Sequence, residues 1–281
     1  LLMRSLAAQA HQAIRLKLFM RVDQFADPGL FDFPDASKIQ NNRVDLYWPD
    51  ADLYGLLFHR LRRSTAAKVF ERLRASSIGE RANARPEQPK GIVDVIAGEF
   101  MGTDKKRGRV YTWLPLHLAD AFGQTSPRTF LTAWREAARH SPAPVDRAVD
   151  HLGIAEGVRK ASEDRLRELT EDYWWISTAL LPLKGELVPM PLEMLETIWR
   201  REQTAKTIID ESTKREKLAP VQLADGIQTP EKAVVAALKA IGVLEIRANG
   251  KINVPDIFRI EAGIKRKGGV KPPRRGRAGD R

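Results

Sequence analysis

Residues 125–134 read Thr125-Ser126-Pro127-Arg128-Thr129-Phe130-Leu131-Thr132-Ala133-Trp134 and mark a helix start around which the chain is organised. Ser126 is a favoured N-cap, and Pro127 has the fixed φ that suits the first helical position. One apolar face is predicted, made of Phe130, Leu131, Trp134, Ala137 and Ala138. Arg128 then lies in the first turn, where the helix dipole disfavours a cation. This indicates either an anionic ligand nearby or a surface arginine paired with a neighbouring carboxylate.

The composition is that of a folded, cytoplasmic protein. Of the 281 residues, 43% are hydrophobic and none is cysteine, which allows buried cores and excludes disulfides and thiolate metal sites. No apolar run approaches the roughly 20 residues that cross a bilayer, so we expect no membrane partner. Much of the net charge of +11 lies between residues 264 and 281, in a Gly/Pro/Arg tail that we expect to be disordered.

Residues 1–60 predict the edge of an α/β layer. Residues 16–23 form a candidate buried strand that ends in Arg21 and Asp23, and a second candidate strand covers 44–48. One strand forms no sheet by itself. The first strand therefore pairs either with the second or with a preceding segment that is not in this sequence.

Residues 61–141 predict a small α-helical domain. Amphipathic patterns cover 64–76 and 91–101, a third helix covers 113–122, and the helix that starts at Ser126 follows. Short turns rich in glycine and proline join them, which is typical of a compact helical unit.

Residues 142–263 predict further helices and a winged helix. One helix is expected over 153–180 and another over about 191–216. The first ends in the aromatic run Tyr173-Trp174-Trp175-Ile176, which favours core packing, with a protein interface as the alternative.

The winged helix is predicted from a helix followed by a hairpin. Thr229-Pro230 begins the helix and Gly242 ends it. Strands over 243–248 and 251–254 then flank Asn249-Gly250, the strongest short hairpin signal. The hairpin would be the wing of the module.

The predicted helix of this module offers few side chains that read bases, chiefly Glu231, Lys232 and Lys239. We therefore expect the winged helix to serve packing or contact with a partner. The alternative is sequence-independent binding of DNA or RNA phosphates by the wing and the basic tail. The candidate residues for this are Lys251, Lys265, Arg266, Lys267, Lys271, Arg274 and Arg275.

Six stretches together carry a resemblance to a known family. They are Lys17-Leu18-Phe19-Met20-Arg21-Val22-Asp23-Gln24-Phe25, Phe33-Pro34-Asp35-Ala36-Ser37-Lys38, Tyr111-Thr112-Trp113-Leu114-Pro115-Leu116-His117-Leu118-Ala119-Asp120, Ser126-Pro127-Arg128-Thr129-Phe130-Leu131, Val254-Pro255-Asp256-Ile257-Phe258-Arg259 and Arg266-Lys267-Gly268-Gly269-Val270-Lys271. With them the chain resembles the C-terminal portion of bacterial P-loop ATPases of the AAA+ or STAND type that carry an appended winged helix. The similarity runs over most of the chain.

The resemblance implies a mainly α fold in four parts. These are a remnant edge of the α/β P-loop ATPase core at 1–60, an α-helical lid at 61–141, a helical and winged-helix domain at 142–263, and the basic tail at 264–281. Arg21 or Asp23 matches the sensor-one position near the γ-phosphate, and Arg128 matches the sensor-two arginine of the lid. An arginine suits this role because it binds phosphate in a bidentate manner and stays charged.

The chain lacks the rest of an ATPase. No G-x-x-x-x-G-K-[ST] sequence is present, and no apolar strand ends in paired acids that could hold magnesium. We therefore expect no catalytic residue and no ATP hydrolysis by this chain alone. The resemblance implies that a missing N-terminal segment binds ATP and Mg, in a homo-oligomer that serves stress or antiphage defence.

We expect neither a metal site nor another enzymatic activity in this chain. The histidines at 11, 59, 117, 140 and 151 show no ligand spacing, so we interpret them as surface or packing residues. The alternative function is a winged-helix adaptor that binds nucleic acid or protein and has no ATPase activity.

Overall fold

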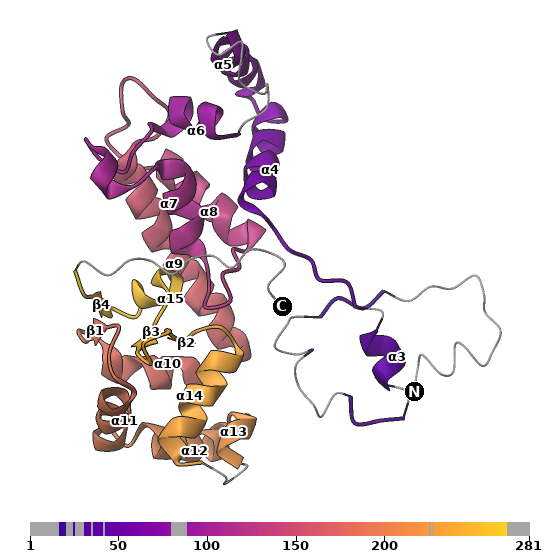
Figure 1. Cartoon of the computed structure of the whole chain (residues 1–281), viewed down its shortest axis with the longest axis vertical. Helices are drawn as coiled ribbons and strands as arrows, with labels where there is room; N and C mark the ends of the chain where they lie inside the picture. The colour runs from indigo at the N-terminus through magenta and orange to yellow at the C-terminus, as the bar shows by residue number, and fades with distance from the viewer. Residues whose placement is uncertain are drawn as a thin grey trace, which may run out of the picture. The chain divides into compact units, whose positions relative to one another are not determined.

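Figure 1 shows a computed structural model of the chain. It describes residues 17–20, 25, 31–34, 36–41, 43–79, 89–224, 226 and 228–268, with the side chains of 76–79 excepted. The chain divides into two compact units, Leu1–Leu46 and Tyr47–Arg281. The described part is mainly helical, as predicted.

The first unit does not show the predicted strands where it is described. Its one described regular element of any length is helix α3 (Ala36–Gln40). Residues 17–20 and 43–49 form no strand, which corrects the prediction of strands over 16–23 and 44–48 for these positions. The reason is physical: a strand needs a sheet and a covering layer, and the apolar side chains here are largely exposed. The exposed fractions are 61% for Leu18, 82% for Phe19, 80% for Val44 and 72% for Leu46.

The second unit begins with a group of short helices, as predicted for the helical domain. They are α4 (Asp50–Arg62), α5 (Ala67–Gly79), α6 (Pro89–Ala97), the 3-10 turn η2 (Lys105–Arg107), α7 (Val110–Leu118) and α8 (Pro127–Ala138). The predicted boundary at residue 60 falls inside α4. Helix α7 ends before the predicted end at 122, because Asp120 Oδ1 accepts hydrogen bonds from the backbone N–H groups of Phe122 and Gln124 and closes a turn.

Aromatic side chains hold these helices together. Tyr54 of α4 is fully buried, stacks on Tyr111 with ring centroids 4.6 Å apart, and meets Phe130 edge to face at 5.1 Å. Its hydroxyl donates a 2.9 Å hydrogen bond to the carbonyl of Tyr111. Phe130 and Trp134 are buried on the predicted apolar face of α8, whereas Ala138 at the end of that face is exposed.

Helix α9 (His151–Asp172) packs closely along α8 (Figure 1). Two glycines on α9 permit this contact, because a Cβ atom at Gly157 would lie 2.2 Å from the carbonyl oxygen of Ala133, and one at Gly153 would lie 2.8 Å from that of Ala137. Asp150 caps α9 by accepting a 2.8 Å hydrogen bond from the N–H of Gly153.

The predicted helix over 153–180 is two helices. Helix α9 ends at Asp172, and α10 (Trp175–Leu180) follows after a break. Trp175 and Ile176 are buried, which confirms core packing for this half of the aromatic run, and Tyr173 and Trp174 are half-buried.

The C-terminal part mixes short helices with very short strands. Its elements are η3 (Leu181–Leu183), β1 (Leu187–Val188), α11 (Leu192–Arg201), α12 (Thr204–Arg215), α13 (Val221–Ala224), α14 (Pro230–Ala240), β2 (Glu245–Ile246), β3 (Ile252–Asn253), α15 (Asp256–Arg259) and β4 (Lys265–Arg266). The predicted helix over 191–216 is divided into α11 and α12 at Gln203, whose φ of 51° is left-handed.

The predicted hairpin is confirmed: β2 and β3 pair antiparallel across the turn that contains Asn249-Gly250. Met190, just after β1, forms an antiparallel bridge with Ile252 of β3, and β1 pairs in parallel with β4. The backbone N–H of Lys265 donates to the carbonyl of Glu186 at 2.8 Å, and that of Lys267 donates to Val188 at 2.9 Å. These bonds correct the prediction that the disordered tail begins at 264.

Within the described residues, no helix has both the length and the apolar character that spanning a membrane requires.

Candidate functional site

Arg128 lies in the first turn of α8, as predicted. Pro127 is the first residue of the helix, and Ser126 precedes it, although the Ser126 side chain makes no capping hydrogen bond. The Arg128 side chain is 77% exposed, and its Nη1 donates a 2.9 Å hydrogen bond to Oε1 of Glu168 on α9. In this structure Arg128 is thus a surface arginine paired with a carboxylate, which is the second of the two interpretations of its position.

The ion pair between Arg128 and Glu168 is accessible to a competing anion. Glu168 is also 3.6 Å from Nη1 of Arg165, so two guanidinium groups share one carboxylate. A phosphate could take the place of Glu168, because a guanidinium binds carboxylate and phosphate in the same forked geometry. What the arrangement can do chemically is therefore to bind an anion, not to transfer a proton.

The other predicted sensor residues, Arg21 and Asp23, lie outside the described residues. Lys271, Arg274 and Arg275 of the predicted nucleic-acid site lie outside them as well.

The remaining predicted phosphate-binding residues lie on the β2–β3 hairpin and on or next to β4. Lys251 follows the turn of the hairpin and is exposed. Lys265 of β4 and Lys267, which follows the strand, are exposed on either side of Arg266. Because β3 is bridged to Met190 and β4 pairs with β1, the segments that carry these lysines are linked through residues 187–190.

Arg266 differs from the lysines beside it. Its side chain is 26% exposed, and Nη1 lies 3.2 Å from Oδ2 of Asp256. Arg259 Nε donates a 2.8 Å hydrogen bond to Oδ1 of the same carboxylate, and His117 Nε2 lies 3.4 Å from Oδ2. We call these four residues the Asp256 cluster. Arg266 is a structural residue within it rather than a free phosphate ligand.

The Asp256 cluster was not predicted from the sequence. His117 comes from α7, whereas Asp256 and Arg259 come from α15 and Arg266 from β4. No local spacing connects residues so far apart in the chain. The Trp113 ring stacks on His117 at 3.8 Å, and His117 Nδ1 lies 2.7 Å from the Trp113 carbonyl, which agrees with its interpretation as a packing residue.

Burial shifts the pKa of His117 in this cluster and of Asp120 in the turn that follows α7. Desolvation lowers the pKa of His117, and the Asp256 carboxylate opposes that shift. Desolvation also raises the pKa of Asp120 to about 6, although its hydrogen bonds from Gln124 and Phe122 act in the opposite direction. Asp120 lies in the turn whose Ala121 N–H donates a 2.9 Å hydrogen bond to the carbonyl of Gly242, after α14. The turn therefore links the helical domain to the hairpin module.

The chain matches no protein-family model, no curated protein and no solved structure.

Helix α14, which would be the recognition helix of the predicted winged helix, is mostly buried. Ala233, Val234, Val235, Ala237 and Leu238 all face the core. Lys232 and Lys239 remain exposed, and Glu231 lies 4.0 Å from Arg200. Two exposed lysines supply few hydrogen-bonding groups for recognising base edges.

Among the described residues, no group of His, Asp and Glu could hold a metal ion.

Proposed function

We propose that this chain is the nucleotide-sensing lid and winged-helix portion of a P-loop ATPase that acts as an NTP-dependent switch. The observation that carries the proposal is Arg128: an exposed guanidinium in the first turn of α8 that is paired with one solvent-accessible carboxylate on another helix. A triphosphate would compete with Glu168 for this group. The lid would then change its contact with α9 according to the nucleotide.

The order of elements supports a winged-helix module in the proposal. Strand β1 lies between α10 and α11, further helices up to α14 follow, and the hairpin β2–β3 comes next. The bridge between Met190 and Ile252 joins the first strand segment to the hairpin. Since α14 is largely buried, the module would serve packing or protein contact rather than base reading.

The proposal needs a partner segment. ATP and Mg would be held by a P-loop segment, and the assembled protein would work as a homo-oligomer in stress or defence. Arg21 and Asp23 would supply the sensor-one group. This chain by itself would not hydrolyse ATP.

The first test is the gene sequence upstream of the codon for Leu1. We expect the same reading frame to encode a Walker A lysine there, and we expect the extended protein to show an ATP-dependent change in hydrogen exchange along α8 and α9. Arg128→Ala should abolish that change. Arg139→Ala is the matched control, because it removes an equally exposed arginine, 68% against 77%, after the other end of the same helix. An upstream frame without a P-loop, or an Arg128→Ala protein with the normal response, would contradict the proposal.

A second candidate is a winged-helix adaptor that binds nucleic acid phosphates. The observation that favours it is the exposure of Lys251, Lys265 and Lys267 on neighbouring segments. A salt titration of DNA binding distinguishes the two. Because β4 belongs to the fold, the chain should be truncated after Gly268 and not before 264. Sequence-independent binding that falls steeply with salt, and that a Lys251→Gln/Lys265→Gln/Lys267→Gln variant of the truncated chain loses, would favour the adaptor.

A further inference from the structure

The α4–α5 hairpin carries a concentration of charge that the proposed function does not use. Residues 59–75 contain six arginines and lysines and one acidic residue, Glu71. The two helices are fixed to each other by the rings of Phe58 and Phe70, whose centroids are 5.5 Å apart, and by a 3.0 Å ion pair between Arg62 and Glu71. The cations are thus held on a defined surface.

Four of these cations have no acidic partner among the described residues. Glu71 is occupied by Arg62 and by Arg74, each at 3.0 Å. Over the part of the chain that the structure describes, Arg60, Arg63, Lys68 and Arg72 form no ion pair, and all four are exposed. We call these four residues the hairpin cations. Unpaired like charges placed together raise the local potential and attract an anion.

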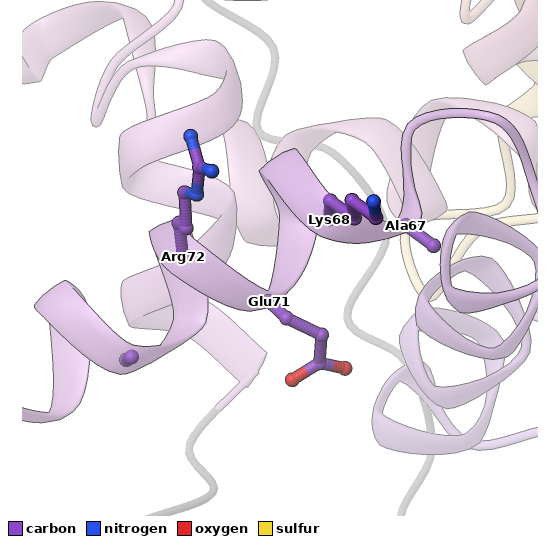
Figure 2. A pocket seen from close by; sticks show the side chains of 5 residues that line it. Ala67, Lys68, Glu71 and Arg72 are labelled. Carbon is purple, nitrogen blue, oxygen red and sulfur yellow. The ribbon is translucent and has the colours of Figure 1, made fainter.

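Figure 2 shows the α5 part of this surface. Lys68 and Arg72 line a shallow, open hollow together with Ala67, Glu71 and Ala75. Lys68 and Arg72 are one helical turn apart, about 6 Å along the axis. Arg72 extends away from the side to which Glu71 points, so the acid does not cover it. The small alanines leave room for a backbone to approach the helix.

We propose that the hairpin cations bind the phosphate backbone of a nucleic acid without reading its sequence. The cations come from two helices and lie on an open surface, whereas a single nucleotide is usually held in an enclosed pocket. They therefore suit an extended polyanion with repeated phosphates.

The surface fits other macromolecules less well. A protein interface of this kind needs aromatic or large apolar anchors at its centre. An interfacial membrane helix needs an apolar face, but Phe70 of α5 is buried against Phe58. Val69, 58% exposed, is the large apolar side chain that remains outside on the described part of α5. Charge complementarity to phosphates is thus the property that the hairpin offers.

This inference goes beyond the proposed function because Arg128 takes no part in it. It is also separate from the wing and β4, which lie near the other end of the chain. The test uses the full chain without ATP and a short fluorescein-labelled DNA duplex, titrated between about 50 and 200 mM salt. One variant replaces all four hairpin cations with glutamine: Arg60→Gln, Arg63→Gln, Lys68→Gln and Arg72→Gln.

The matched control removes the same charge elsewhere, from four exposed lysines that belong to no proposed binding surface. Its substitutions are Lys105→Gln, Lys106→Gln, Lys206→Gln and Lys217→Gln. The basic tail is intact in both variants, so its contribution cancels in the comparison. Thermal melting followed by circular dichroism verifies that each variant folds, which we expect because every replaced side chain is exposed.

We expect the hairpin variant to weaken DNA binding at least about tenfold and to reduce the slope of log K against log salt by about 3, while the control reduces it by less than about 1. Equal losses in the two folded variants would overturn the proposal, since binding would then follow net charge alone. The proposal would equally be overturned if the hairpin variant bound DNA normally but lost binding to phosphatidylserine vesicles or to polyglutamate.

Discussion

Arg128 Nη1 donates a 2.9 Å hydrogen bond to Oε1 of Glu168, a residue 40 positions later in the chain. The bond joins the start of α8 to the C-terminal half of α9, and both side chains reach solvent, with exposed fractions of 77% and 32%. An ion pair at such a position contributes little to stability, because water screens it. The pair matters for function because another group can take the place of either side chain.

Glu168→Gln should release Arg128 without disturbing the fold. The midpoint of thermal unfolding should change by less than about 2 °C, as for an exposed pair. In the extended protein of the proposed function, nucleotide affinity should rise several-fold because a competing carboxylate is gone. Titration with a fluorescent ATP analogue measures this, and a lower affinity in Glu168→Gln would argue against competition between Glu168 and phosphate.

Gly157→Ala should destabilise the second unit by about 1–3 kcal/mol or more, the usual cost of forcing extra atoms into a packed contact. The new Cβ would lie 2.2 Å from the Ala133 carbonyl oxygen, so α8 and α9 would have to separate. Gly55→Ala is the control: apart from its own helix backbone and chain neighbours, no described atom lies within 4 Å of the added Cβ, and an alanine in α4 should stabilise by about 0.5–1 kcal/mol. Urea unfolding of both variants tests the prediction, which equal effects would contradict.

Asp120 should make stability fall as pH rises from about 4 to 6. Burial raises its pKa in the folded state to about 6, whereas the unfolded carboxyl titrates near 3.8, so over this range the unfolded chain has already lost the proton that the folded chain retains. Asp120→Asn keeps the oxygen that accepts both backbone hydrogen bonds and removes the charge. It should stabilise the protein at pH 8 by up to about 3 kcal/mol and flatten this part of the pH profile.

The measurement is urea unfolding of the wild type and Asp120→Asn between pH 4 and 8. The difference in unfolding free energy should grow from pH 4 to 6 and then stay constant. A difference that does not vary with pH would mean that the Asp120 carboxyl titrates alike in both states.

Asp256→Ala should cost roughly 2–3 kcal/mol, because it leaves Arg259 and Arg266 half-buried without their carboxylate. The loss should also release β4, so hydrogen exchange at the N–H groups of Lys265 and Lys267 should accelerate. Glu211→Ala is the control, since its partners Lys214 and Arg215 are exposed and its removal should leave the melting temperature nearly unchanged. Unaltered exchange at β4 in a folded Asp256→Ala protein would refute the role of the cluster.

Elements with strong local signals were predicted well. The start of α8 follows from Pro127, and the β2–β3 hairpin follows from Asn249-Gly250 between alternating strands. Long helices were predicted with the wrong ends. The division at Gln203 could not be foreseen, because a left-handed φ at a non-glycine residue is imposed by packing rather than by local preference.

The candidate site was predicted in position but not in contacts. The helical spacing placed Arg128 in the first turn of α8, yet it could not identify Glu168 as the partner, since α9 is reached only through the close helix crossing at Gly157. Arg266 was expected in a disordered tail, but Asp256 holds it in the fold. The sequence shows that residues 59–75 are basic, but it does not show which of their cations are paired. The structure shows that Glu71 pairs with Arg62 and Arg74 and not with the hairpin cations.

Local chemistry was sufficient for the mainly helical class, the helix start at Ser126-Pro127, the hairpin turn at Asn249-Gly250 and the basic character of the C-terminus. Each depends on the conformational preferences of a few consecutive residues or on composition. Only the folded chain decided which charges meet, as in Arg128 with Glu168 and in the Asp256 cluster. The reason is that an ion pair or a buried pKa shift depends on distance and solvation in space, and residues far apart in the chain acquire these only when their helices and strands pack.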